Sequence, residues 1–167
     1  MDDHDKNRKT RDLIDQEYKW NIEAMYPDEK KWDADYADVL RMSEEYIRFS
    51  GNLGKSADML LSAFRERDAL WLVAERVYVY ARMKRDEDNR VSKYQAMADK
   101  CHSLLAKASA AMSFFTPELL EIPEETLLSF IKQEEGLKQY EFAILNTLRQ
   151  KAHVLSKPEE KCSRRLR

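Results

Sequence analysis

Three histidines and two cysteines are the side chains of this 167-residue sequence best suited to metal binding or nucleophilic chemistry. The strongest candidate is His102, because Asp99 precedes it by one helical turn and Cys101 lies beside it. A catalytic zinc site usually takes three protein ligands, and a common helical arrangement is H-E-x-x-H. The sequence contains no copy of that pattern. We therefore expect His102 to be a histidine on a helix surface rather than a metal ligand.

Cys101 is the second candidate, as a nucleophile. A reactive cysteine needs solvent access and a nearby base or positive charge. Cys101 falls on the apolar stripe of a predicted helix, and the side chain of its neighbour His102 points about 100° away around the helix axis. The pattern therefore favours a buried structural thiol.

Clusters of charge offer little chemistry. The run Asp86–Asp88 is the densest acidic group and is typical of a solvated turn, and the basic tail at residues 164–167 is too small to predict nucleic-acid binding. The formal net charge is −2, from 29 basic and 31 acidic residues, which gives no general attraction to nucleic acid or anionic lipid. There is also no glycine-rich phosphate loop and no run of 18 apolar residues. We expect no nucleic-acid partner, no membrane partner and, from the cysteine usage, a cytoplasmic location.

Composition predicts the elements that must carry these side chains. Hydrophobic residues make up 43% and charged residues 36%, with only three glycines and four prolines. Sheets need many turns, and turns use glycine and proline, so this composition favours long helices. The predicted fold is all-α, an antiparallel bundle of about five to six helices.

Capping residues and apolar stripes locate the long helices. The first should begin near Asp28 and the second after Ser56, running through Val77–Tyr80, with the stretch Ala69–Ala74 apolar on every side and hence central. Residues 84–90 are all polar and predict a turn. The third helix should follow Ser92 with a heptad seam. The seam residues are Tyr94, Ala98, Cys101, Leu105, Ala108, Met112 and Phe115.

Shorter helices should follow. Thr116-Pro117 and Pro123 are typical of helix starts, Gly136 of a helix end, and a last helix should begin near Leu137. Residues 18–27 are aromatic and end in a proline, which predicts an irregular segment packed on the domain.

Five separated segments resemble oligoendopeptidase F, a family of thimet-oligopeptidase-like zinc metallopeptidases, over roughly residues 11–160. Their order and spacing also agree with that family. The segments are Tyr18–Ile22 continuing through Met25-Tyr26-Pro27 to Trp32, then Phe49–Leu53, Tyr78–Asp99, Phe114–Leu119 and Leu148–Ser156.

The resemblance implies a two-lobed α-helical enzyme built around a deep channel, which admits short peptides and excludes folded proteins. In that family an H-E-x-x-H helix and a later glutamate bind zinc, and the glutamate of the helix activates the bound water. Those residues lie beyond position 167 in a full-length member. The resemblance therefore implies no catalytic residue, no metal ligand and no cofactor for this chain, with zinc and oligopeptides binding only the full-length enzyme. Its implied partner is the catalytic lobe of the same peptidase.

The resemblance also divides the chain. We expect residues 1–12 to be a disordered N-terminus and residues 13–155 to be the helical N-terminal domain of the family. Ser156 and Glu159 form a capping box, yet the residues that follow carry no apolar stripe. Residues 156–167 therefore read as the start of a truncated helix with a basic tail, from a truncated product or a shifted reading frame.

Three functions remain open from the sequence. The chain could be the non-catalytic lobe of the peptidase, a stand-alone interaction module that pairs through the Tyr94–Phe115 seam, or a lobe that binds peptides without cutting them. A lobe without its partner should expose an apolar patch larger than a few hundred Å². We expect that interlobe surface near Tyr80, Met83 and His153.

Overall fold

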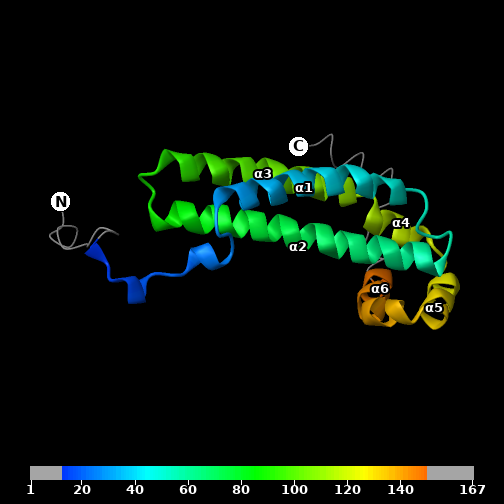
Figure 1. The fold of residues 1–167 in the computed structure, drawn as a ribbon. Coiled ribbons are helices and arrows are strands. Elements are labelled where there is room, and N and C mark those ends of the chain that lie inside the picture. The colour runs from blue at the N-terminus through cyan, green and yellow to red at the C-terminus, as the bar shows by residue number, and fades with distance from the viewer. Residues whose placement is uncertain (1–12, 150–167) are drawn as a thin grey trace. The chain divides into compact units, whose positions relative to one another are not determined.

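The computed structural model describes residues 13–149, and all regular secondary structure in that range is helical (Figure 1). The prediction of an all-α fold is therefore confirmed. The α-helices are α1 (Glu29–Tyr46), α2 (Ala57–Glu87), α3 (Ser92–Met112), α4 (Phe115–Glu121), α5 (Glu124–Gln133) and α6 (Glu141–Arg149). Short 3-10 helices are η3 (Gln16–Tyr18), η4 (Ile22–Ala24), η5 (Ile47–Phe49) and η6 (Glu135–Tyr140). None of the described helices is long and apolar enough to span a membrane.

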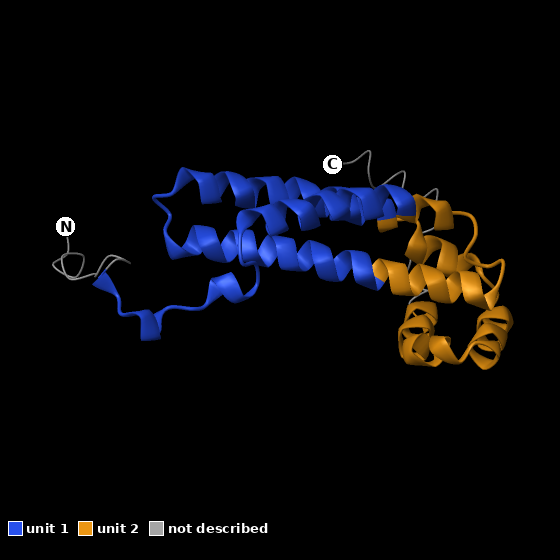
Figure 2. Cartoon of the chain, in the orientation of Figure 1, with its two compact units in different colours: residues 1–45, 68–111 blue, residues 46–67, 112–167 orange. Residues whose placement is uncertain are grey.

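The chain forms two compact units (Figure 2). Unit 1 comprises residues 1–45 and 68–111, and unit 2 comprises residues 46–67 and 112–167. The expected N-terminal and C-terminal segments, residues 1–12 and 156–167, lie outside the described residues.

Unit 1 is built on α2. The indole Nε1 of Trp32 on α1 donates a hydrogen bond of 2.9 Å to the carbonyl of Val77, and the thiol of Cys101 on α3 lies 3.8 Å from the same oxygen. Helices α1 and α3 therefore both pack on α2. Within unit 1 the buried apolar side chains are Ile22, Tyr26, Trp32, Val39, Leu70, Ala74, Val77, Tyr80, Ala81, Met97, Ala98, Cys101, Leu104 and Ala108.

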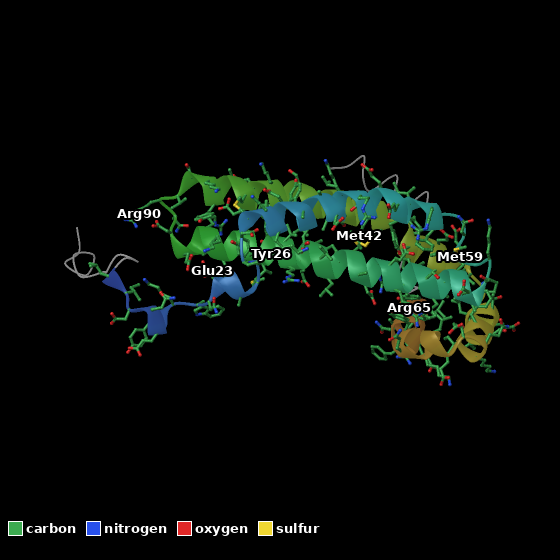
Figure 3. The ribbon with its side chains drawn as sticks, in the orientation of Figure 1. Glu23, Tyr26, Met42, Met59, Arg65 and Arg90 are labelled. Carbon is green, nitrogen blue, oxygen red and sulfur yellow. The ribbon has the colours of Figure 1, made fainter. Side chains whose placement is uncertain are left out.

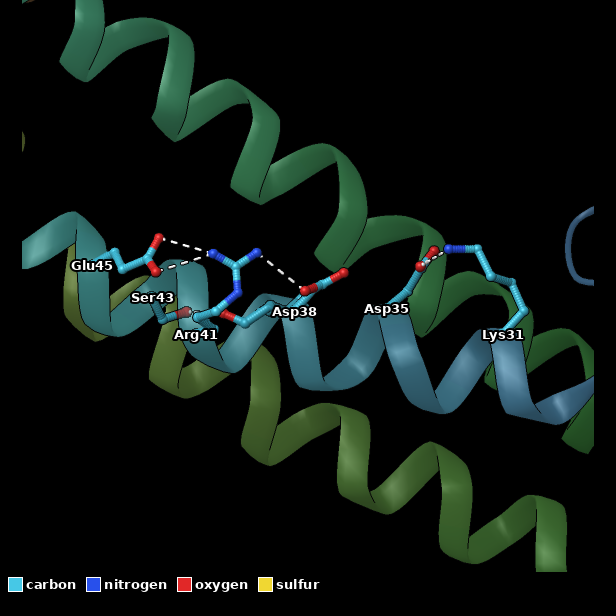
Figure 4. A network of polar contacts seen from close by, with 7 residues as sticks. Lys31, Asp35, Asp38, Arg41, Ser43 and Glu45 are labelled. Carbon is cyan, nitrogen blue, oxygen red and sulfur yellow. Dashed lines mark hydrogen bonds and ion pairs between the residues drawn. The ribbon is translucent and has the colours of Figure 1, made fainter.

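The outer face of α1 is polar. Lys31 pairs with Asp35, and Arg41 pairs with both Asp38 and Glu45 at helical spacings of three and four (Figure 4). The two pairs of Arg41 are exposed and contribute little to stability, because water screens them. Asp35, in contrast, is buried, so its carboxylate lies where α1 packs on the rest of unit 1.

Two predictions about α2 need correction. Residues 84–87 belong to the helix and not to a turn, because Lys84 is buried and pairs with Glu87 in the last helical turn. The stretch Ala69–Ala74 is not buried on every side, since Trp71 is 41% exposed and Leu72 is 69% exposed. The helical reading of Val77–Tyr80 is confirmed.

The seam of α3 is also shifted from its predicted position. Ala98, Cys101 and Ala108 are buried as expected, but Leu104 is buried where Leu105 was expected. An α-helix has 3.6 residues per turn, so a stripe spaced by sevens drifts around its surface.

Unit 2 packs short helices around the ring of Phe64 on α2. This ring meets Phe115 of α4 edge-on at 4.8 Å and stacks on Tyr140 of η6 at 4.4 Å between centroids. Within unit 2 the buried apolar side chains are Tyr46, Phe49, Leu53, Ala57, Leu60, Leu61, Ala63, Phe64, Phe115, Leu119, Leu120, Ile122, Leu127, Ile131, Leu137 and Ile144.

Helix boundaries in unit 2 confirm some predictions and correct others. The hydroxyl of Ser56 accepts a hydrogen bond from the Met59 amide at 3.1 Å, so the predicted cap of α2 is confirmed. Helix α4 begins at Phe115, two residues before Pro117. Proline is compatible with the first turn of a helix because the backbone N–H groups there have no hydrogen-bond partner within the helix, so the missing N–H of proline costs nothing. Gly136 lies within η6, so the last α-helix begins at Glu141 rather than near Leu137.

Candidate functional site

The three residues expected at an interlobe surface have different environments. Tyr80 is 3% exposed and belongs to the core of unit 1, whereas Met83 is half-buried and lines a surface groove. His153 lies outside the described residues. The assignment of an interlobe surface to these residues stays a prediction, with Met83 as its accessible member.

The residues considered for catalysis form no reactive cluster within residues 13–149. His102 is exposed, and its ring meets the ring of Tyr78 edge-on at 5.5 Å. Cys101 is fully buried, and this burial raises the pKa of its thiol to about 11, which keeps it protonated. No three acidic, histidine or cysteine side chains of the described part are placed to hold a metal ion.

A different feature stands out in unit 1, where the N-terminal segment is fixed to α2. The ammonium of Lys84, 8% exposed, lies 2.5 Å from the Glu23 carboxylate and 3.5 Å from that of Glu87. It also lies about 6 Å from the ring centroids of Tyr80 and Tyr94. A lysine stem buried between aromatic rings with its charge paired at the end is a stable arrangement. The ion pair therefore holds η4 on the surface of α2.

Tyr26 provides the second attachment (Figure 3). Its hydroxyl donates a hydrogen bond of 2.9 Å to Asp35, and its ring meets that of Tyr80 edge-on at 5.0 Å. Arg76 donates to the carbonyl of Met25 at 2.7 Å and places its guanidinium 4.9 Å from the centre of the Tyr26 ring. The segment is thus held by both its backbone and its side chains.

These contacts shift two pKa values in opposite directions. Burial, followed by the hydrogen bond to Asp35, moves the pKa of Tyr26 well above its usual range. For Asp35, burial favours the neutral acid, but hydrogen bonds from Lys31 and Tyr26 outweigh it and lower the pKa of the carboxyl. At neutral pH the pair is therefore a neutral phenol donating to a carboxylate.

The anchored segment forms one wall of a surface groove of about 270 Å³. We call this the aromatic groove, lined by Tyr18, Trp20, Ile22, Met83, Asp86 and Glu87. Tyr18 is 73% exposed and Trp20 is 75% exposed, whereas Ile22 is buried beneath them.

The acidic residues of the aromatic groove are already paired. The Asp86 carboxylate accepts a hydrogen bond from Arg85 and also lies 3.6 Å from Arg82, and these contacts lower the pKa of Asp86. Glu87 pairs with Lys84. The distinctive chemistry of the groove is therefore its exposed aromatic and apolar surface.

Unit 2 contains a second polar attachment, made by Glu118 of α4. Its two carboxylate oxygens accept hydrogen bonds from the backbone amides of Gly51 and Leu53, each at 2.7 Å. Gly51 has a φ of +75°, a conformation that glycine adopts without steric cost. Glu118 thereby fixes the loop after η5.

A wider groove of about 560 Å³ lies beside this loop. It is lined by Gly51, Gly54, Phe114, Pro117, Glu118, Glu121, Ile122, Pro123 and Thr126. The carboxylate of Glu118 in this groove already accepts hydrogen bonds from two backbone amides, and the remaining lining is a mixture of polar and apolar side chains.

The sequence alone did not reveal these attachments. Lys84 and Glu23 are 61 residues apart, and Glu118 lies 65 residues or more from its two amide partners. The only available signal was that Phe49–Leu53 and Phe114–Leu119 both belong to the segments that resemble one family.

Known proteins match this chain along most of its length. A family model described as Oligopeptidase F matches residues 118–163. The chain is 34% identical to oligopeptidase PepF of Bacillus subtilis over 141 residues, which cover 84% of this chain and 21% of that protein. It is 33% identical to the group B oligopeptidase PepB of Streptococcus agalactiae, covering 90% of this chain and 25% of that protein.

Solved structures agree with these matches. The crystal structure of oligoendopeptidase-F from Enterococcus faecium is 29% identical with a TM-score of 0.69, covering 80% of this chain and 26% of that one. A putative peptidase from Chlamydophila abortus shares the fold, with a TM-score of 0.80 at 21% identity over 95% of this chain and 27% of its own. The chain thus spans about a quarter of the length of the relatives that it matches.

Proposed function

Because the chain belongs to the N-terminal region of the oligoendopeptidase F family, we propose that it is the non-catalytic N-terminal lobe of a zinc metalloendopeptidase that hydrolyses short peptides. The observation that carries this proposal is the match to known oligopeptidases along 84–90% of this chain but only 21–25% of their length. Zinc and the general base would come from the part of the enzyme that this chain does not contain.

The proposed role of this lobe is to bind the catalytic lobe and to limit what enters the channel between them. The chain offers rigid attachments of its own segments, through Lys84 and Glu118, and no reactive cluster in its described part. Such an arrangement suits positioning rather than chemistry. The cytoplasm remains our proposed location, on the cysteine usage of the sequence.

A chimera tests this proposal. This chain would replace the matching 141-residue stretch of Bacillus subtilis PepF, and cleavage of a quenched-fluorescence peptide would be measured. We expect the chimera to cleave the peptide and to lose activity when a chelator removes the metal. A folded chimera with native-like helix content and no cleavage would contradict the proposal.

The alternative of a stand-alone module pairing through the α3 seam has less support. Ala98, Cys101 and Ala108 on that seam are at most 1% exposed within a single chain, and the thiol of Cys101 faces α2. A partner helix would have to displace these contacts. Sedimentation of the purified chain tests this alternative, which requires a dimer or a captured partner.

Peptide binding without cleavage is a second candidate function, which the 560 Å³ groove beside Gly51 favours. Titration of a short peptide into the purified chain by calorimetry measures it directly. Absence of heat above dilution at millimolar peptide would rule this function out.

A further inference from the structure

We propose that the aromatic groove of unit 1 is the docking site for the remaining part of the whole peptidase, which covers Trp20 and Tyr18 with apolar side chains of its own. This inference rests on the proposed function and assigns it a specific surface. The groove is defined by Tyr18, Trp20 and Ile22 on one side and by Met83, Asp86 and Glu87 on the other.

Two large aromatic side chains of the groove, close to one another in sequence, are exposed. Tyr18 and Trp20 are 73% and 75% exposed, although tyrosine and tryptophan are the residues that most often dominate protein interfaces when they become buried. A single exposed apolar side chain on a surface is ordinary, but adjoining ones with a groove between them are typical of a binding site.

Contacts within unit 1 fix the groove before any partner binds. Glu23 and Tyr26, which follow Trp20 in the same segment, are held by Lys84 and Asp35. The carbonyl of Trp20 itself accepts a hydrogen bond from the amide of Ile22 at 3.0 Å. Association costs less conformational entropy when the binding surface is already ordered.

The charged side chains of the groove favour an apolar occupant. Arg82 and Arg85 pair with Asp86, and Lys84 pairs with Glu87, so the acidic side chains of the groove have internal partners. A basic occupant would have to compete with these pairs. An apolar occupant gains the burial of the two aromatic rings and of Met83 without breaking any of them.

Helix α2 carries further exposed apolar side chains near Met83. Val79 and Leu72 precede Met83 by four and eleven residues, which places all three within about 40° of one another around the helix axis. Val79 is 38% exposed and Leu72 is 69% exposed. Two exposed apolar side chains of α2 therefore lie on the helix face that carries Met83.

The identity of the occupant follows from the length of the relatives. About three quarters of each matched oligopeptidase has no counterpart in this chain. The groove is also formed by the two segments Tyr18–Ile22 and Tyr78–Asp99, both of which resemble that family. Both segments contribute to one exposed groove. The occupant that we propose is therefore the part of the peptidase that has no counterpart in this chain.

The test compares this chain with the full-length chimera containing it, using hydroxyl-radical oxidation read by mass spectrometry. We expect Trp20 and Tyr18 to react readily in the isolated chain and several-fold more slowly in the chimera. Rapid oxidation of Trp20 in a chimera that still cleaves peptides overturns this inference and leaves the proposed function intact. A folded chimera without cleavage contradicts both.

Substitution separates docking from folding. Trp20→Ala should leave the melting temperature of the isolated chain unchanged, because Trp20 is largely exposed there, and should lower that of the chimera. Phe142→Ala is the matched control, since Phe142 is also 75% exposed but belongs to unit 2. An equal loss in both proteins, or no loss in the chimera, overturns the inference. Slow oxidation of Trp20 in the isolated chain does so too, because it would mean that a second copy or another segment of this chain covers the groove.

Discussion

Glu118 shows how one side chain can determine a loop at a distance in sequence. Its carboxylate accepts two backbone hydrogen bonds from a loop 65 and 67 residues earlier. Hydrogen bonds to a charged acceptor contribute more to stability than bonds between neutral groups. Removing the Glu118 carboxylate would take this acceptor away from both amides.

We predict that Glu118→Ala destabilises the chain by about 1–3 kcal/mol and that Glu118→Gln, which keeps one acceptor oxygen, has a smaller effect. The measurement is urea-induced unfolding followed by circular dichroism. Glu44→Ala removes an exposed carboxylate from α1 and serves as the control. Equal stability of the Glu118→Ala and Glu44→Ala variants would show that the two hydrogen bonds contribute nothing.

Cys101 provides a prediction about pH. Its thiol has a pKa of about 11 in the folded chain against an ordinary value of 9.0, so the folded state retains its proton at a pH where the unfolded state loses it. This contribution to stability is complete below about pH 9 and is lost as the pH rises towards 11, by at most about 2–3 kcal/mol.

The measurement is the melting temperature between pH 8 and pH 11 for the parent chain and for Cys101→Ala. Buried tyrosines also destabilise the folded state at high pH, but they do so in both proteins. We expect the parent chain to lose more stability over this range. Parallel curves would indicate that the thiol is not protonated more strongly in the folded state.

At the level of elements, η6 packs so closely on α2 that a side chain at Gly136 would require a neighbour to move. A Cβ atom added to Gly136 would lie 2.6 Å from Cδ2 of Leu61, a buried side chain of α2. Because this distance is far below van der Waals contact, either the leucine or the 3-10 helix would have to move.

We therefore predict that Gly136→Ala costs about 1–3 kcal/mol in the free energy of unfolding. Leu61→Ala alone should cost about 2–5 kcal/mol through loss of core packing. The double variant should cost less than the sum, because removing the leucine side chain makes room for the new methyl group. Strict additivity in chemical denaturation would argue against the close approach.

The attachment of the N-terminal segment to α2 depends on Lys84. Lys84→Ala should remove the pair with Glu23 and expose the rings of Tyr80 and Tyr94, at a cost of about 1–2 kcal/mol because Glu23 is itself largely exposed. Hydrogen–deuterium exchange should become faster at residues 22–26. Lys100→Ala, on the exposed side of α3, is the control. Unchanged exchange in this segment would contradict the assignment.

Sequence patterns predicted the parts of the fold that depend on neighbouring residues. The starts of α1, α2 and α3 follow local capping and apolar spacing, and the structure confirms them within a residue or two. The end of α2 was missed because Lys84 is buried by contacts with a segment 61 residues earlier, which no local pattern contains. Residues 84–87 are polar, but the partly buried ion pair between Lys84 and Glu87 lies in the last turn of the helix.

The same reasoning explains what could be said about the candidate site. The sequence predicts that Cys101 and His102 do not form a catalytic pair, because the side chains of adjacent residues on a helix point about 100° apart. The sequence predicts that Ala69–Ala74 is central, but Trp71 in this stretch is 41% exposed, since apolar composition does not determine how much of a helix its neighbours cover. The aromatic groove could not be predicted from the sequence, because its position depends on contacts that Glu23 and Tyr26 make with distant residues.

For the whole molecule, we propose that these 167 residues position and restrict but do not cleave. Two observations support this proposal: the chain matches only about a quarter of each relative, and its sequence contains no H-E-x-x-H. The metal and the general base would then be supplied in the same polypeptide by residues that follow the matched region.

Peptidase assays of the purified chain test this claim most directly. A quenched-fluorescence oligopeptide would be incubated with the chain and added zinc, beside the chimera with Bacillus subtilis PepF at equal concentration. We predict no turnover by the isolated chain and chelator-sensitive cleavage by the chimera. Robust, chelator-sensitive cleavage by the pure chain alone would contradict the account.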